Sequence, residues 1–226
     1  GHPIVGTSVA LARDRNLSGD QSLIVLEAQI GIVRVGVRDL HGPAPFAEFD
    51  LPKLPEQIGA APAADVLADA LGLLPSEIGF QNHKARRYSA GNPFTFVPVA
   101  SREVLHRAAP NPIGWQAAFG NDDAVGAFVY CREPEQRTSH YRARMFAPAA
   151  GVPEDPATGS AAAAFAGVVV EFDKPTGGWH SRVIEQGFEM GRPSLITLSL
   201  EMEGGRLETA RIGGRAVPVM SGQLEV

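Results

Sequence analysis

The stretch Glu154-Asp155-Pro156-Ala157-Thr158-Gly159-Ser160 runs directly into the apolar run Ala161-Ala162-Ala163-Ala164-Phe165-Ala166. Proline, glycine and short polar residues are typical of a tight turn, and the small apolar residues that follow are typical of a buried helix. A helix start carries unpaired backbone N–H groups and a partial positive charge, so it attracts anions. The stretch therefore predicts an anion-binding loop at the start of a buried helix.

The first eight residues, Gly1 to Ser8, repeat this layout. With an offset of 153 residues, four pairs coincide: His2 with Asp155, Pro3 with Pro156, Gly6 with Gly159, and Thr7 with Ser160. Two such loops placed face to face would form a site for a small carboxylate, flanked by a histidine and an aspartate as acid and base. The alternative is ordinary capping, in which the aspartate and proline only start a helix.

Several motifs together carry a family resemblance. They are Arg144-Met145-Phe146-Ala147-Pro148, Gly151 to Ala161, Gly1-His2-Pro3 with Gly6-Thr7, Gly91-Asn92-Pro93, Glu185-Gln186-Gly187 and Met190 to Ser194. On these motifs the whole chain resembles the phenazine-biosynthesis isomerase (PhzF) family, relatives of diaminopimelate epimerase. The resemblance implies an α+β fold of two similar halves, each a curled, mostly antiparallel sheet around a central helix, with the active site in the cleft between them.

The resemblance also implies a chemistry. Members similar to the phenazine enzyme isomerise a dihydro-hydroxyanthranilate by moving a proton, use no metal or organic cofactor, and commonly form homodimers. Carried onto this chain, the active-site positions are His2, Asp155 and Ser160, with Gly1 and Gly159 lining the substrate. In the family a proton-shuttling glutamate lies upstream of the Gly-His-Pro motif, and here that motif begins the sequence. The position of the main proton carrier is therefore unassigned.

The unequal halves lead to a further expectation. Strands of the second half begin near Lys84, far upstream of Asp155, whereas a single residue precedes His2. We expect residues 1–82 to be the remainder of an N-terminal half whose upstream strands are missing, and residues 83–226 to form the C-terminal half, with the last strands crossing to the first. Cleavage, cloning, numbering or a truncated relative would each account for this. Without the upstream glutamate, we expect residues 1–226 alone to be inactive.

Composition disfavours several classes of function. The net charge is −5 and the basic residues are scattered, which argues against nucleic acid as a partner. The longest apolar run, residues 161–170, is shorter than the roughly 20 residues that cross a bilayer, so we expect no membrane partner. The single cysteine, Cys131, suits a reducing, cytoplasmic location. The histidines show no paired spacing typical of metal ligands, so no metal site is predicted.

These observations favour a cofactor-independent isomerase or epimerase that moves a proton on a small cyclic carboxylate. The N–H groups around Gly159 and Ser160 are expected to hold the carboxylate, Asp155 a polar substituent, and His2 to act as acid or orienting donor. The alternative is a non-catalytic small-molecule-binding or regulatory member of the family. A serine hydrolase is disfavoured because residues 158–161 are not Gly-x-Ser-x-Gly.

Hydrophobic periodicity predicts helices over residues 3–15, 62–74, 101–108 and 160–170. The predicted strands cover residues 23–28, 32–37, 46–51, 84–88, 94–99, 124–130, 141–146, 179–185, 195–202, 206–212 and 216–220. The glycine pairs Gly204-Gly205 and Gly213-Gly214 separate the last three of these strands and are typical hairpin turns.

Overall fold

The computed structural model describes residues 1–17, 20–28, 31–120, 124 and 126–223. Five α-helices lie among these residues: α1 (His2–Asp14), α2 (Ala64–Leu71), α3 (Arg102–Arg107), α4 (Pro112–Phe119) and α5 (Gly159–Asp173). The strands are β1 (Gln21–Ala28), β2 (Gly31–Arg38), β3 (Phe46–Asp50), β4 (Glu56–Gln57), β5 (Arg86–Ser89), β6 (Pro93–Pro98), β7 (Ala127–Cys131), β8 (Tyr141–Ala147), β9 (Val152–Asp155), β10 (Gly178–Gln186), β11 (Ser194–Glu203) and β12 (Arg206–Arg215).

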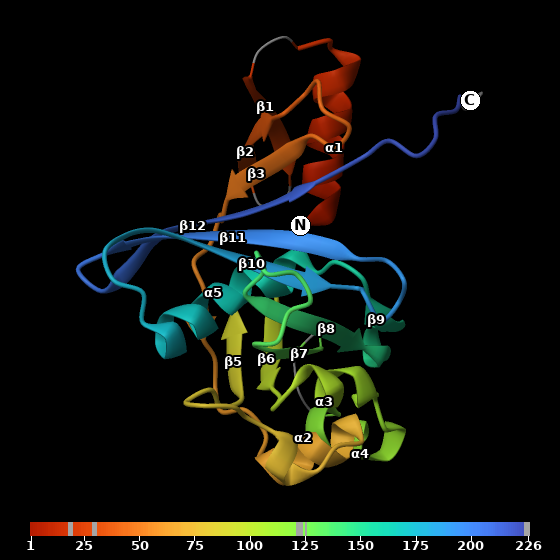
Figure 1. Ribbon diagram of the computed structural model, residues 1–226, viewed down its shortest axis with the longest axis vertical. Helices are drawn as coiled ribbons and strands as arrows, with labels where there is room; N and C mark the ends of the chain where they lie inside the picture. The colour runs from red at the N-terminus through yellow and green to blue at the C-terminus, as the bar shows by residue number, and fades with distance from the viewer. Residues whose placement is uncertain (18–19, 29–30, 121–123, 125, 224–226) are drawn as a thin grey trace.

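All the strands belong to one curled sheet, which Figure 1 shows running through the whole molecule. The strand order is β1-β2-β3-β12-β11-β10-β8-β7-β6-β5-β4, with β9 paired to β8. Its neighbours are antiparallel except for the pairs β8–β10 and β6–β7. The last strand, β12, pairs with β3 on one side and β11 on the other, so it joins the sheet around α1 to the sheet around α5. The predicted α+β class is confirmed, while the division at residue 82 stays a prediction.

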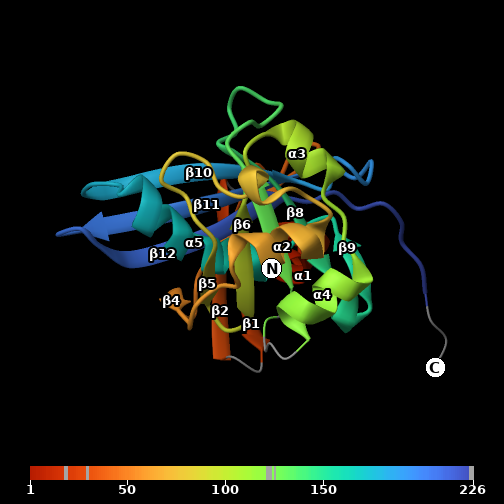
Figure 2. The ribbon, with the colours of Figure 1, turned by 90° about the horizontal axis from the view of Figure 1, so that it is seen from below.

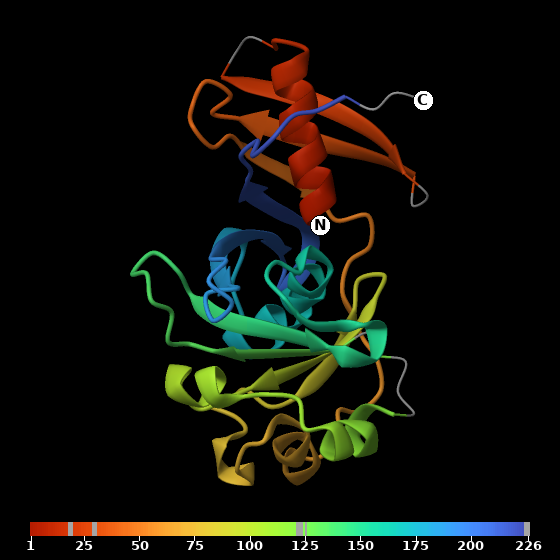
Figure 3. The same cartoon turned by 90° about the vertical axis from the view of Figure 1, so that its right-hand side faces the viewer.

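Helix α1 lies along one face of β1, β2 and β3 (Figure 3). It buries Val5, Ser8, Val9 and Ala12, whose spacing of three and four residues places them on one side of a helix. These side chains meet the alternate residues of the strands that point inward, such as Val33, Val35 and Val37. The amphipathic pattern of α1 therefore fixes which side of this helix faces the sheet.

Helix α5 is the centre of the larger part of the molecule. Every residue from Ala161 to Val169 is buried, and the helix contacts β11 and β12 as well as β5 and β6. The Phe165 ring packs against the rings of Phe96, Phe128, Tyr130 and Tyr141, with centroid separations between 4.8 and 5.8 Å. Small alanines let the sheet close tightly around the rest of the helix. The predicted buried helix is confirmed.

Helices α2, α3 and α4 lie on the opposite face of β6, β7 and β8 (Figure 2). A second hydrophobic cluster packs between these helices and the strands. Helix α3 begins as predicted, because the Ser101 hydroxyl accepts a hydrogen bond from Val104 N at 3.2 Å. Helix α4 was not predicted. Its signals were Asn111, whose side chain accepts from Ile113 N, and Pro112 in the first turn.

Two predictions at the end of the chain are wrong. Strand β12 continues through Gly213 and Gly214 to Arg215 instead of turning there, and residues 216–220 lie outside the strands. A Cβ on Gly213 would lie 2.5 Å from the ring of Phe46, so this glycine serves close packing within a strand. The Gly204-Gly205 turn is confirmed, since both residues have the positive φ values, 54° and 79°, of a tight hairpin.

None of the helices in the described residues has the length and apolar character needed to cross a bilayer.

The C-terminal end of α5 carries a buried carboxylate, Asp173. It accepts hydrogen bonds from the Tyr141 hydroxyl at 2.7 Å and Arg182 Nε at 3.3 Å, pairs with Arg132, and lies 3.3 Å from His83 Nε2. Burial alone would raise the pKa of Asp173, but the bonds from His83 and Tyr141 and the charges of Arg132 and Arg182 lower it to about 2. The network therefore ties α5 to the sheet through an ionised group.

Because the pKa of Asp173 lies below its ordinary value of 3.8, its contribution to folding is present above that value and is lost as the pH falls through about 2. We expect Asp173→Asn to lower the free energy of unfolding at pH 7 by about 1–2 kcal/mol, and the difference from wild type to shrink towards pH 2. Urea titrations at both pH values measure this. The control Asp50→Asn, which breaks an exposed pair with Arg211, should change stability by less than about 1 kcal/mol. An equal loss for Asp173→Asn at both pH values would contradict the account.

Candidate active site

The N-termini of α1 and α5 meet with their backbones in contact. A Cβ built on Gly1 would lie 2.6 Å from Gly159 Cα, and one built on Gly159 would lie 2.5 Å from Gly1 Cα. No side chain larger than hydrogen fits at either position unless the helices move apart. The sequence prediction that two helix starts face each other is confirmed, and the glycines are what permits it.

The register of the predicted repeat is wrong. Helix α1 begins at His2, so Pro3 lies in its first turn and Gly6 within it, whereas Pro156 lies before α5, which begins at Gly159. The residues that meet are Gly1, the N-cap of α1, and Gly159, the first residue of α5, and not the two prolines. Proline is compatible both with the first turn of a helix and with a preceding turn, so it was a poor marker of register.

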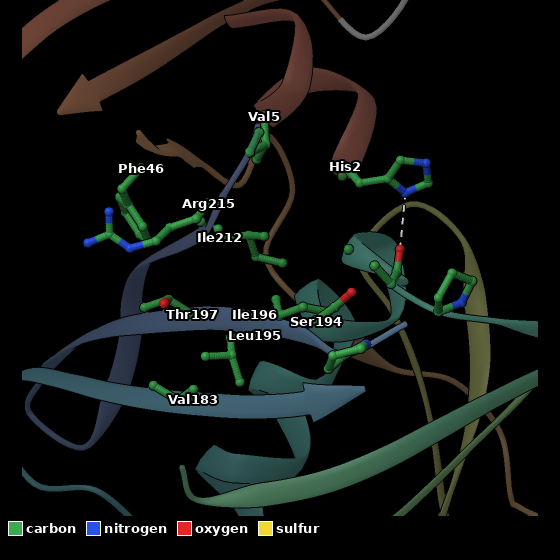
Figure 4. Close-up of a pocket in the computed structure, with 18 of the residues that line it drawn as sticks. His2, Val5, Phe46, Val183, Ser194, Leu195, Ile196, Thr197, Ile212 and Arg215 are labelled. Atoms are coloured by element: carbon green, nitrogen blue, oxygen red, sulfur yellow. Dashed lines mark hydrogen bonds between the residues drawn. The ribbon is translucent and has the colours of Figure 1, made fainter. Parts of the chain in front are cut away.

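A cavity of about 780 Å³ opens beside the paired helix starts (Figure 4). Four of the predicted site residues line it: Gly1, His2, Asp155 and Gly159. Ser160, the fifth, is half-buried in the first turn of α5 and is not among the lining residues. The opposite wall is formed by β10, β11 and β12, and its apolar side chains include Val183, Leu195, Ile196 and Ile212. The cavity thus has one polar end, at the helix starts, and one largely apolar wall.

The His2 ring reaches from α1 to the loop before α5. Its Nδ1 lies 3.0 Å from the carbonyl oxygen of Ala157 (Figure 4). A carbonyl can only accept, so Nδ1 carries the proton in this bond, which leaves Nε2 of the neutral ring able to take one up. The contact joins the two halves of the site and assigns the tautomer of the exposed imidazole.

Asp155 ends the short strand β9, which is fixed by the pairing of Asp155 with Met145 on β8. One of its carboxylate oxygens, Oδ2, accepts a hydrogen bond from the Thr158 hydroxyl at 2.6 Å. Thr158 occupies the N-cap position of α5, but its side chain makes no hydrogen bond to the N–H groups of the first turn. The capping interpretation of Asp155 is therefore wrong: this carboxylate bonds to a side chain, and the described structure shows no side-chain cap on α5 or on α1.

Two arginines of β8 hold the surrounding loops. Arg144 makes a bidentate pair with Glu154, with both N–O distances 2.8 Å, and donates through Nη1 to the carbonyls that end α3, the shortest bond being 2.7 Å to Ala108. Arg142 donates to Glu185 at 3.1 Å and to Glu189 at 2.9 Å. The motifs around these residues were recognised in the sequence, but their pairing was not, because each pair joins segments that lie apart along the chain.

Two basic residues, Arg192 and Arg215, also line the cavity. The Arg215 guanidinium is already engaged, since it donates to Asp39 at 2.8 Å and to the Ala44 carbonyl at 2.7 Å. Within the described part of the chain there is no group of three His, Cys, Asp or Glu side chains placed to bind a metal ion. Metal-free chemistry stays a prediction.

The relatives of a chain with this fold and this polar site between two helix starts are named isomerases. The family model for phenazine biosynthesis-like protein matches residues 1–222. The chain is 46% identical over 227 aligned residues to an uncharacterized isomerase of Mesorhizobium japonicum, covering 99% of this chain and 74% of the relative. It is 30% identical over 224 residues to the trans-2,3-dihydro-3-hydroxyanthranilate isomerase of Pseudomonas fluorescens, covering 96% and 71%.

Among solved structures, a phenazine biosynthesis protein of the PhzF family from Bacillus anthracis superimposes with a TM-score of 0.82. The match covers 95% of this chain and 72% of that one at 23% identity, which supports the fold alone. Together with the whole-chain family match, these similarities show that the chain belongs to the phenazine biosynthesis-like (PhzF) family of isomerases.

We expect Gly159→Ala to force the helix starts apart and to lower the free energy of unfolding by about 1–3 kcal/mol, the usual cost of overpacking. The matched control is Gly6→Ala within α1, where an added Cβ meets no atom within 4 Å. That change should stabilise the helix by about 0.5–1 kcal/mol. Thermal and chemical denaturation of both variants measure these effects. A Gly159→Ala protein as stable as the Gly6→Ala protein would contradict the close approach.

Proposed function

We propose that this protein is a cofactor-independent isomerase that moves a proton on a small cyclic carboxylate held at the paired starts of α1 and α5. The observation that carries the proposal is the pair of uncapped helix N-termini, in backbone contact, opening onto one cavity with His2 and Asp155. Free N–H groups and two positive dipole ends favour an anion there. The name of the Pseudomonas fluorescens relative supports a cyclic, dihydroaromatic carboxylate as substrate.

In this mechanism the N–H groups at the start of α5 bind the substrate carboxylate. Removing a proton from a ring carbon next to an unsaturated system builds negative charge, which the fixed helix dipoles stabilise without reorganisation. We assign proton transfer to His2, because the bond from Nδ1 to the Ala157 carbonyl leaves Nε2 of the neutral ring able to take up a proton. Asp155 accepts a hydrogen bond from a polar substituent and fixes the ring in place. The apolar wall of β10 to β12 contacts the rest of the ring.

Although the resemblance puts the family's proton-shuttling glutamate upstream of the Gly-His-Pro motif, we propose that His2 is enough for turnover. The purified protein is then expected to convert trans-2,3-dihydro-3-hydroxyanthranilate, or a close cyclic carboxylate, with incorporation of solvent deuterium in D2O. His2→Ala should lower kcat/KM by about 10²–10⁴-fold, the usual contribution of a positioned acid or base. His41→Ala, which changes an exposed histidine outside the cavity, is the control and should leave the rate unchanged.

Two outcomes count against the proposal. Full activity of His2→Ala would show that the proton carrier lies elsewhere. Saturable binding of the carboxylate with neither turnover nor deuterium exchange would instead identify a non-catalytic small-molecule-binding protein.

We also propose a homodimer and a cytoplasmic location, which the family resemblance and the single, buried Cys131 support. Sedimentation equilibrium of the purified protein tests the first of these.

A further inference from the structure

Gln186, the last residue of β10, is completely buried behind the loop that carries Asp155. Its side chain makes three hydrogen bonds to that loop. Oε1 lies 3.1 Å from Thr158 N, while Nε2 lies 2.6 Å from the Asp155 carbonyl oxygen and 2.9 Å from Thr158 Oγ1. One amide therefore contacts both residues on either side of the Pro156-Ala157 turn.

The chemistry of the partners fixes the direction of every bond in this group. A backbone N–H only donates and a carbonyl only accepts, so Oε1 of Gln186 must face Thr158 N and its NH2 must face the Asp155 carbonyl. The same NH2 then donates to the Thr158 hydroxyl. Since that hydroxyl has one proton, the proton is left to point at Asp155 Oδ2, 2.6 Å away. The chain of bonds runs from Gln186 through Thr158 to Asp155.

The turn that follows Gln186 is pressed against the same loop. Gly187 has a φ of 78°, and a Cβ there would lie 2.7 Å from the Pro156 carbonyl oxygen and 2.4 Å from that of Arg192. Only glycine adopts this φ without strain and also lets the two carbonyl oxygens lie this close to its Cα. Gln186 and Gly187 together therefore let the end of β10 pack closely against the loop that carries Asp155.

We propose, on the basis of the proposed function, that Thr158 and Gln186 are positioning residues for Asp155. The Thr158 hydroxyl donates to Oδ2, and Gln186 holds that hydroxyl and the Asp155 backbone carbonyl in place. Together they hold the half-buried carboxylate in one orientation, with Oδ1 left for a polar substituent of the substrate. The Thr158 hydroxyl serves Asp155 in place of capping α5, which also keeps the N–H groups of that helix start free for the substrate carboxylate.

Three variants test the proposal. Thr158→Val keeps the shape and removes the hydroxyl, and we expect it to lower kcat by about 10- to 100-fold, as a misplaced group does, with a smaller change in KM. Thr158→Ser retains the hydroxyl and should restore most of the rate. Gln186→Glu replaces the donor by a carboxylate, so the Thr158 proton turns towards residue 186, and the rate should fall as for Thr158→Val.

A double-mutant cycle with Asp155→Asn separates positioning from a general structural role. If Thr158 acts through Asp155, adding Thr158→Val to Asp155→Asn should cost less than about threefold in kcat. A full, multiplicative loss in that background, or a wild-type kcat for Thr158→Val alone, would overturn the proposal.

Crystal structures of the unliganded Thr158→Val and Thr158→Ser proteins keep the test independent of turnover. We expect the Asp155 carboxylate to leave its position in the first and keep it in the second. An unmoved carboxylate in Thr158→Val would overturn the positioning role even if the enzyme is active. If the Asp155 carboxylate is displaced in Thr158→Val but the wild-type protein turns over no cyclic carboxylate, the positioning role stands. Only the proposed function is then refuted.

Discussion

The contact between the Gly1 and Gly159 backbones is the constraint on which the rest of the site depends. It brings two helix N-termini, each with a partial positive charge, to the same point, and like charges repel. Packing imposes this arrangement, because α1 and α5 are each fixed along their length by a sheet. An anion in the cavity beside the two ends would relieve the repulsion, so the fold itself creates a preference for a negatively charged ligand.

Strand β12 is the element that makes this contact possible. It pairs with β3, which covers α1, and with β11, which covers α5, so a single strand sets the distance between the two helices. Gly213 lets the Phe46 ring pack directly on this strand. Around the contact, Arg144 fixes Glu154 and Gln186 fixes Thr158, so the loop before α5 is held from two directions. A site formed from loop residues thereby gains the rigidity of the sheet.

Much of this arrangement could be predicted from local patterns. The apolar run after Gly159 predicts a buried helix, and the motifs around it predict the family and the facing helix starts. The register of the two helix starts could not be predicted from the prolines, because Pro3 lies inside α1 and Pro156 precedes α5. The Gly213-Gly214 pair has the composition of a turn, yet its environment is a strand, which depends on the distant Phe46.

The role of Asp155 shows the same limit. An aspartate near a helix start is most simply a cap, and only the positions of the Thr158 hydroxyl and of Gln186, on a different strand, show that its carboxylate bonds to a side chain instead. Interactions of this kind join residues that share no local pattern. The sequence therefore identifies the residues that take part but not the hydrogen bonds between them.

The central claim is that the paired helix starts bind a carboxylate. A titration of the ¹⁵N-labelled protein with 3-hydroxyanthranilate, the aromatic counterpart of the substrate named for the Pseudomonas fluorescens relative, tests it most directly. The account predicts the largest saturable shifts at the backbone amides of Gly159, Ser160 and Ala161 and of the first turn of α1. Shifts confined to other parts of the chain, or saturation that leaves these amides unchanged, would contradict it.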